Sequence, residues 1–261
     1  MTKTWGVFFS VLLYGVLSFA IILPAENDLP ALMLNQNDSL FFERGVAPGK
    51  SDSSLCGPTS AVNWLQLKSF QQPYSKEHLV ELVREVGADL SAKNIDINQG
   101  LVEPDLVTFL KTLNRKLGIK QDYAIKGRYG SGVTIQEEDI WSPAVQILML
   151  NFREIPRPLE PGLRPGRPGR NIPLPDDLMD RPLVRGNHFV LKVFADRDNK
   201  LLGVIDPENP SRFSLVRVNF VTSLTDTTPV IQLKPATRQD LSAFTFGVPL
   251  SWSLISIIEE K

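Results

Sequence analysis

Apolar residues recur three and four positions apart in three segments of the first half of the chain, which is the spacing of one helix face. Pro58, Ser75 and Pro104 lie near the starts of these segments. Proline is tolerated there because its missing N–H would have no partner, and serine can accept a bond from the first backbone N–H groups. Gly118 is suited to end the third segment. The pattern predicts helices over 56–70, 75–86 and 104–118.

The second half of the chain changes to short runs rich in Val, Ile, Leu and Phe, which are typical of strands. We expect strands over 122–125, 144–152, 188–194, 201–205, 213–220 and 230–233. Helices followed by strands predict an α+β fold, in which the helices pack on one mostly antiparallel sheet.

Residues 155–186 interrupt the strand pattern with eight prolines and six arginines. Such a composition fits neither a sheet interior nor a helix, so we expect an extended loop inserted before His188. It is either a surface excursion or a basic lid or docking arm beside a site.

The N-terminal residues 1–25 have the pattern of a targeting segment. Lys3 is followed by an uncharged, largely apolar stretch to Ala25, and Ser18 to Ala20 forms a small-x-small pattern that favours cleavage after Ala20. The stretch is also about the roughly 20 residues that an uncleaved membrane anchor needs. Both interpretations export the body of the protein, 26–261, which we expect to be a single domain.

Composition excludes several classes of function. The formal net charge of −1 gives no basis for nucleic-acid binding, which calls for a basic excess. One cysteine excludes an internal disulfide, and one cysteine with two histidines disfavours a Cys/His zinc site. The sequence contains no phosphate-binding loop, dinucleotide fingerprint or calcium loop, so we expect no cofactor.

The single cysteine, Cys56, lies where a polar loop enters the first predicted helix. The N–H groups and the positive end of a helix dipole favour a thiolate, and the Cys56 N–H would face an oxyanion formed next to it. Gly57 would let a substrate approach closely. This arrangement suits nucleophilic acyl transfer.

A thiol nucleophile needs a base, and the chain offers His78 and His188. His78 lies among charged residues of the second predicted helix, which indicates a solvated histidine. His188 opens a strongly apolar strand, from which it can reach a neighbouring helix end, so His188 is the candidate base.

Asp206 directly follows the next predicted strand and is the candidate for orienting His188. A hairpin loop centred on Arg197 would put Asp206 directly opposite His188, with Cβ atoms about 4.5–5.5 Å apart. A tight turn at Asp198-Asn199 would instead put Asn209 opposite His188 and turn Asp206 to the other face. The sequence leaves both registers open.

Three motifs together resemble the C39-like cysteine peptidases of the papain-like superfamily: Cys-Gly-Pro-Thr-Ser from Cys56, Gly-Asn-His-Phe-Val-Leu-Lys-Val around His188, and Val-Ile-Asp-Pro around Asp206. The resemblance spans about 53–233, with 155–186 as an insertion. It implies a papain-like fold, with Cys56 as nucleophile, His188 as base and Asp206 as orienting residue.

One position departs from the family pattern. The family commonly has a glutamine six residues before the cysteine that completes the oxyanion hole, and Lys50 stands there in this chain. Losing one such donor typically costs on the order of 100–1000-fold in rate.

These observations favour an exported thiol hydrolase that acts on a peptide or protein substrate, cleaving a peptide or other amide bond. A catalytically weak or inactive peptide-binding module and a transglutaminase-like acyl transferase are the alternatives. We expect no nucleic-acid partner, and no membrane contact beyond an N-terminal anchor.

Overall fold

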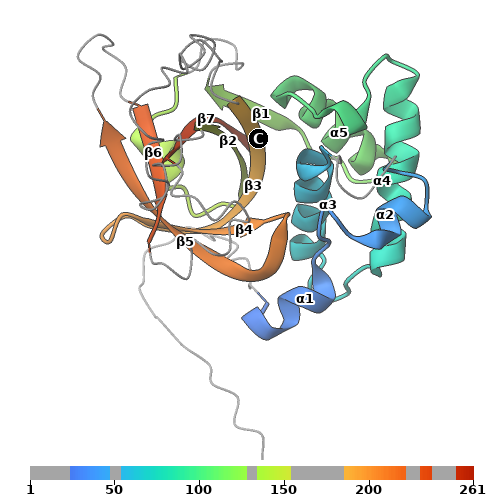
Figure 1. Cartoon of the computed structure of the whole chain (residues 1–261), viewed down its shortest axis with the longest axis horizontal. Coiled ribbons are helices and arrows are strands. Elements are labelled where there is room, and N and C mark those ends of the chain that lie inside the picture. Colours follow the sequence, from blue (N-terminus) through green and yellow to red (C-terminus); the bar gives the residue numbers. More distant parts are fainter. Residues whose placement is uncertain (1–23, 48–53, 128–133, 154–184, 222–229, 237–250) are drawn as a thin grey trace, which may run out of the picture.

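The computed structural model of the chain describes residues 24–47, 54–127, 134–153, 185–221, 230–236 and 251–261 (Figure 1). Residues 1–23 of the expected targeting segment, Lys50, and the Pro/Arg-rich segment up to residue 184 lie outside the described residues. Within the described ranges, none of the helices combines the length and the apolar character needed to cross a bilayer.

The three predicted helices are present and form one side of the molecule with several shorter helices (Figure 1). Ser75 caps the second of them by accepting a bond from the His78 N–H at 3.2 Å, and Gly118 follows the third with a left-handed φ of 68°. The helical elements are η1 (Glu26–Asp28), α1 (Leu29–Leu32), α2 (Ser39–Glu43), α3 (Cys56–Lys68), α4 (Lys76–Ser91), η2 (Ile97–Gln99), α5 (Glu103–Lys116) and α6 (Glu137–Ile140).

The six predicted strands are also present, most of them longer than expected, and a seventh strand follows them. The strands are β1 (Tyr123–Gly127), β2 (Gln146–Arg153), β3 (Arg185–Asp196), β4 (Leu201–Asp206), β5 (Asn209–Val221), β6 (Val230–Pro235) and β7 (Ser251–Glu260).

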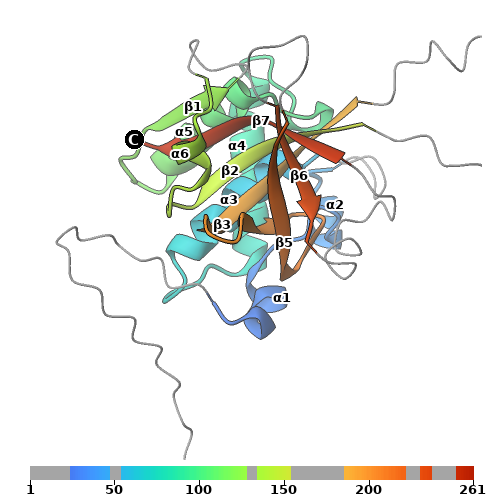
Figure 2. The same cartoon turned by 90° about the vertical axis from the view of Figure 1, so that its left-hand side faces the viewer.

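The strands close into a barrel, seen end-on in Figure 1 and from the side in Figure 2. All pairings are antiparallel, in the order β1-β7-β2-β3-β4-β5-β6, and β6 also pairs with β7. The six described strands from β2 to β7 therefore form a closed ring, and β1 adds to one end of β7 outside it.

This closure corrects the fold that the sequence predicted. The expected α+β, papain-like arrangement of helices on a mostly antiparallel sheet is wrong, because the sheet is a closed barrel with a few helices beside it. The missing element was β7, which supplies partners to both β2 and β6 and so joins the two edges of the expected sheet.

Two apolar clusters hold this architecture together. One is contributed by all six ring strands and fills the barrel, with Leu148, Val190, Leu202, Val216 and Trp252 among its members. The other lies between the helices and the barrel wall, where α3 packs against β3. This second contact brings the start of α3 to the strand that carries His188.

Candidate active site

Cys56 is the first residue of α3 and is a half-buried free thiol. The N-cap residue before it is Leu55, whose side chain offers no acceptor to the N–H groups of the first turn. Cys56 thus begins a helix, as the sequence predicted. The positive end of the helix dipole therefore lies next to the Cys56 thiol.

Gly57 holds this helix end tightly against β3. A Cβ atom at Gly57 would lie 3.2 Å from a ring carbon of Phe189, and the Ser60 hydroxyl donates to the Phe189 carbonyl at 3.2 Å. The expected role of Gly57 was to leave room for a substrate. In the structure the absence of its side chain leaves room for Phe189, the residue next to His188.

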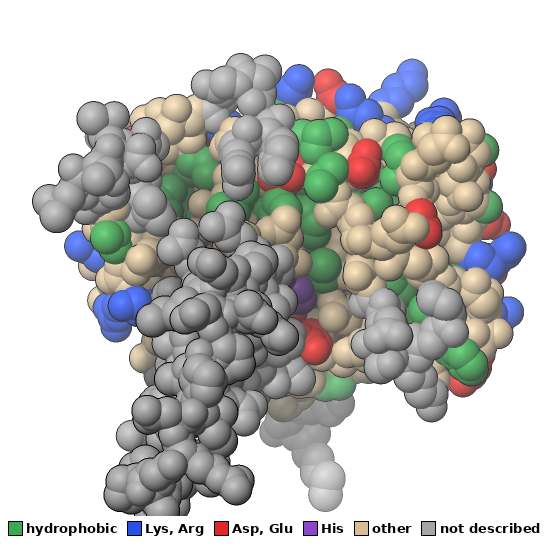
Figure 3. All heavy atoms as spheres, turned by 45° about the horizontal axis from the view of Figure 1, so that its top comes forward, with side chains coloured by type: hydrophobic (Ala, Val, Ile, Leu, Met, Phe, Trp, Pro, Cys, Tyr) green, Lys and Arg blue, Asp and Glu red, His purple; other side chains and the backbone are tan. Residues whose placement is uncertain are grey.

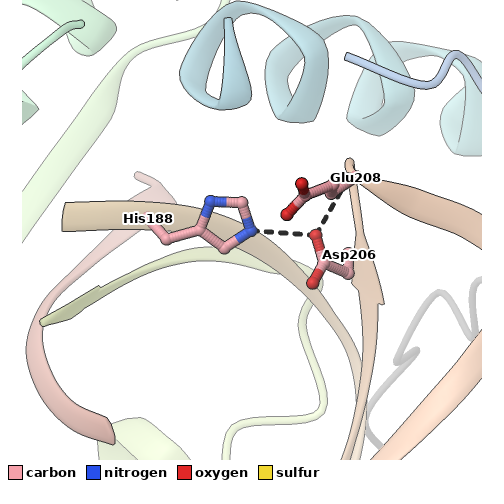
Figure 4. A group of neighbouring side chains, drawn as sticks. All are labelled: His188, Asp206 and Glu208. Atoms are coloured by element: carbon pink, nitrogen blue, oxygen red, sulfur yellow. Dashed lines mark hydrogen bonds and ion pairs between the residues drawn. The ribbon is translucent and has the colours of Figure 1, made fainter. Parts of the chain in front are cut away.

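His188 lies on β3 with its side chain 12% exposed, and its Nε2 is 2.8 Å from Oδ1 of Asp206 (Figure 4). The Cys56 thiol also acts on this imidazole, since it contributes to the raised pKa of His188. Asp206 is thus hydrogen-bonded to His188, and Cys56 acts electrostatically on the same imidazole.

The electrostatics of these three residues favour the charged imidazole. Burial lowers the pKa of His188, but the charge and hydrogen bond of Asp206, followed by those of Cys56, outweigh burial and hold this pKa well above its ordinary value. An imidazolium next to the sulfur is therefore the preferred form at neutral pH.

A β-bulge between β3 and β4 puts the Asp206 side chain on the same face of the sheet as the His188 imidazole. Near the hairpin turn, Asp196 pairs with Leu201 in the tight register, which would turn Asp206 to the opposite face from His188. The register shifts by one between Lys192 and Phe194, so that Lys192 pairs with Val204. After this shift His188 and Asp206 are diagonal neighbours on one face, a geometry that neither of the two expected registers contained.

Asn209 is excluded as the partner of His188. It begins β5, pairs with Asp206 in the adjoining ladder and accepts a bond from the Ser211 hydroxyl at 2.7 Å. The open choice between Asp206 and Asn209 is therefore resolved in favour of Asp206.

Asp206 is 2% exposed and is fixed by groups other than His188. Its Oδ1 also accepts the backbone N–H of Glu208 at 2.9 Å, which shapes the turn between β4 and β5. The N-terminal segment holds this turn from outside: the Gln36 N–H donates to the Pro207 carbonyl and the Asn35 side-chain amide to the Glu208 carbonyl, both at 2.7 Å.

Glu208 adds a second carboxylate to the site. Ligand-type atoms of His188, Asp206 and Glu208 all lie within 4.8 Å of one another, and the Glu208 side chain points toward the imidazole in Figure 4. On the described surface, a histidine and acidic side chains are visible beside one another where barrel and helices meet (Figure 3).

These three residues could in principle hold a metal ion, but their hydrogen bonds disfavour it. Oδ1 of Asp206 already binds the imidazole Nε2 and the Glu208 N–H. A cation bound by the same atoms would have to displace the bond between His188 and Asp206. The arrangement fits a carboxylate that orients a base better than it fits a metal site.

His78 lies apart from this site, as the sequence predicted. It is exposed on α4 and stacks on Tyr74 with ring centroids 5.3 Å apart.

Sequence reasoning assigned no role to Asn35 or Glu208. Glu208 carried a signal, because it lies two residues after Asp206, whereas Asn35 contacts a residue 173 positions away and carried none.

Comparisons of the chain with protein-family models, curated proteins and solved structures found no match. The resemblance to C39-like cysteine peptidases therefore rests on the three sequence motifs alone, and its implied fold is the one that the closed barrel contradicts.

Proposed function

We propose that the protein is an exported thiol hydrolase that cleaves a peptide or other amide bond through Cys56, His188 and Asp206. The observation that supports this most directly is the position of His188, held between the Asp206 carboxylate and a half-buried thiol at the start of a helix. Nucleophile, base and orienting group in this order are what covalent acyl transfer requires.

In the reactive form the Cys56 proton already resides on His188, and the thiolate attacks the amide carbonyl carbon. The carbonyl π electrons move to oxygen, and the resulting oxyanion faces the N–H groups at the start of α3. As the tetrahedral intermediate collapses, the C–N bond breaks and the His188 imidazolium protonates the leaving amine. A thioester to Cys56 remains.

Water completes the cycle. Neutral His188 accepts a proton from water as the water oxygen attacks the thioester carbonyl, and the thiolate leaves with the electrons of the C–S bond. The carboxylic acid product is released, and the proton on His188 is again shared with Cys56. Asp206 holds the ring orientation throughout and stabilises the imidazolium.

Cleavage of a peptide library by the purified chain tests this proposal. We expect hydrolysis by wild type, complete loss in Cys56→Ala, and a decrease on the order of 100–10,000-fold in His188→Gln. His78→Gln is the matched control and should cleave at the wild-type rate. Equal cleavage by wild type and Cys56→Ala would overturn the proposal.

The same assay separates the alternatives. Transfer of the acyl group to an added amine in preference to water would identify an acyl transferase. Peptide binding that survives Cys56→Ala, without cleavage by wild type, would identify a binding module.

A further inference from the structure

The proposed reaction uses Cys56, His188 and Asp206 and assigns no role to the Glu208 carboxylate. Its backbone is held at both ends of the residue, by the bond from its N–H to Asp206 and by the bond from Asn35 to its carbonyl. The carboxylate is therefore kept beside the imidazole, within 4.8 Å of ligand-type atoms of His188 and Asp206.

Among the described residues no lysine or arginine forms an ion pair with this carboxylate, which lies beside the His188 imidazolium. The ion pair at the site joins His188 to Asp206, and the hydrogen bonds of Glu208 within the described ranges are those of its backbone. A half-buried carboxylate placed beside the imidazole acts on the charge of any group brought there, because the surrounding protein screens it less than bulk water does.

We propose that Glu208 selects substrates with a positive charge, an ammonium or a guanidinium, next to the bond that is cleaved, and disfavours substrates with an acidic group there. This selection of substrates by charge rests on the proposed function, the hydrolysis of an amide bond at Cys56. Its physical basis, an attraction of cations to the Cys56 thiol, can be measured without any hydrolysis.

Three thiol reagents of different charge measure this attraction in the full chain. They are the cationic 2-aminoethyl, the neutral methyl and the anionic 2-sulfonatoethyl methanethiosulfonates. In each reaction the thiolate attacks the sulfenyl sulfur, a disulfide forms and methanesulfinate leaves with the electrons of the S–S bond. Cys56 is the only cysteine, so the gain in protein mass reports its modification alone.

The readout is the ratio of the cationic to the anionic reaction rate, each divided by the rate with free cysteine. At low ionic strength and pH 7 we expect Glu208→Gln to slow the cationic reagent and to speed the anionic one, each about threefold, so that the ratio falls about tenfold. High salt, at about 1 M, should remove most of the difference.

Glu138→Gln is the matched control, because it removes the same charge from an exposed position on α6. It should leave the ratio at the wild-type value. An unchanged ratio in Glu208→Gln would overturn the proposal. So would an equal change with all three reagents, since that would indicate an effect on His188 instead of on ligand charge.

Failure of this proposal is distinguishable from failure of the proposed function. A chain that cleaves peptides but shows no effect of Glu208→Gln would retain the thiol chemistry and lose the selection. In a chain that does cleave, peptides with Lys or Arg beside the cleaved bond should be preferred over those with Asp or Glu, and Glu208→Gln should reduce that preference.

Discussion

His188 is the residue at which burial and charge compete most directly. Removal from water opposes the imidazolium, whereas Asp206 and Cys56 favour it, and the pKa of His188 ends well above its ordinary value. Because the pKa is higher in the folded than in the unfolded chain, protonation of His188 stabilises the fold.

This shift predicts a pH dependence of stability. The contribution of His188 should be complete below about pH 6.5, the ordinary value, and should be lost as pH rises through the higher folded pKa. Urea unfolding of wild type and His188→Gln from pH 5 to pH 9 measures it as a difference in unfolding free energy that shrinks with rising pH. Asp206→Asn, which removes the main attractive charge, should flatten the dependence, and a difference that grows above pH 6.5 would contradict the prediction.

Among the secondary-structure elements, the bulged hairpin of β3 and β4 has the largest effect on the site. On the hairpin side of the bulge Phe194 pairs with Gly203, and a Cβ atom at Gly203 would lie 1.9 Å from a carbon of the Phe194 ring. The ring packs over the glycine, and we expect this contact to hold the register shift in place. That shift in turn places Asp206 on the same face as His188.

Gly203→Ala should therefore destabilise the protein by about 1–3 kcal/mol, the usual cost of overpacking. It should also slow alkylation of Cys56, because a displaced strand carries Asp206 with it. In the double variant Phe194→Ala, Gly203→Ala the added methyl group has room, so it should cost much less than in wild type. Chemical denaturation gives both values, and a single variant as stable as wild type would refute this role of the ring.

Sequence patterns predicted the individual elements better than their assembly. The helices at Cys56, Ser75 and Pro104 were predictable because spacing and end residues agreed on them. The strand β7 is rich in apolar residues, and Trp252 and Leu254 alternate with serines at its start, so it carried a strand signal. Nothing local showed that it would join two distant edges. The bulge had no recognisable sequence pattern. Without knowledge of the bulge, the sequence could not show whether Asp206 and His188 lie on the same face.

At the scale of the whole molecule, the N-terminal segment from Met33 to Gln36 connects the helices to the barrel. On one side the buried Asn63 side chain of α3 bonds to both backbone groups of Leu34, at 2.8 and 3.0 Å. On the other side Asn35 and Gln36 hold the turn after Asp206. The segment thus links the helix that begins with Cys56 to the strand that ends with Asp206.

Loss of the hydrogen bond from Asn35 to the turn should lower the rate of the proposed hydrolysis more than the free energy of unfolding. Asn35→Ala removes one side-chain hydrogen bond to the turn, worth about 1 kcal/mol, yet we expect the rate of hydrolysis to fall on the order of tenfold. The pH profile of Cys56 alkylation should shift as well, since a displaced Asp206 supports His188 less. Asn37→Ala, at an exposed neighbour that contributes its backbone N–H to Asn35, should match wild type in both measurements.

The joining of the barrel by β7 has a consequence for biosynthesis. β2 and β6 both depend on residues 251–260 for their second neighbour, although β2 emerges from the ribosome about a hundred residues earlier. Until those residues are made, both strands present unsatisfied backbone groups that can pair with other nascent chains. The barrel therefore cannot close until β7 has been made, and chains interrupted before β7 should be the ones that chaperones retain.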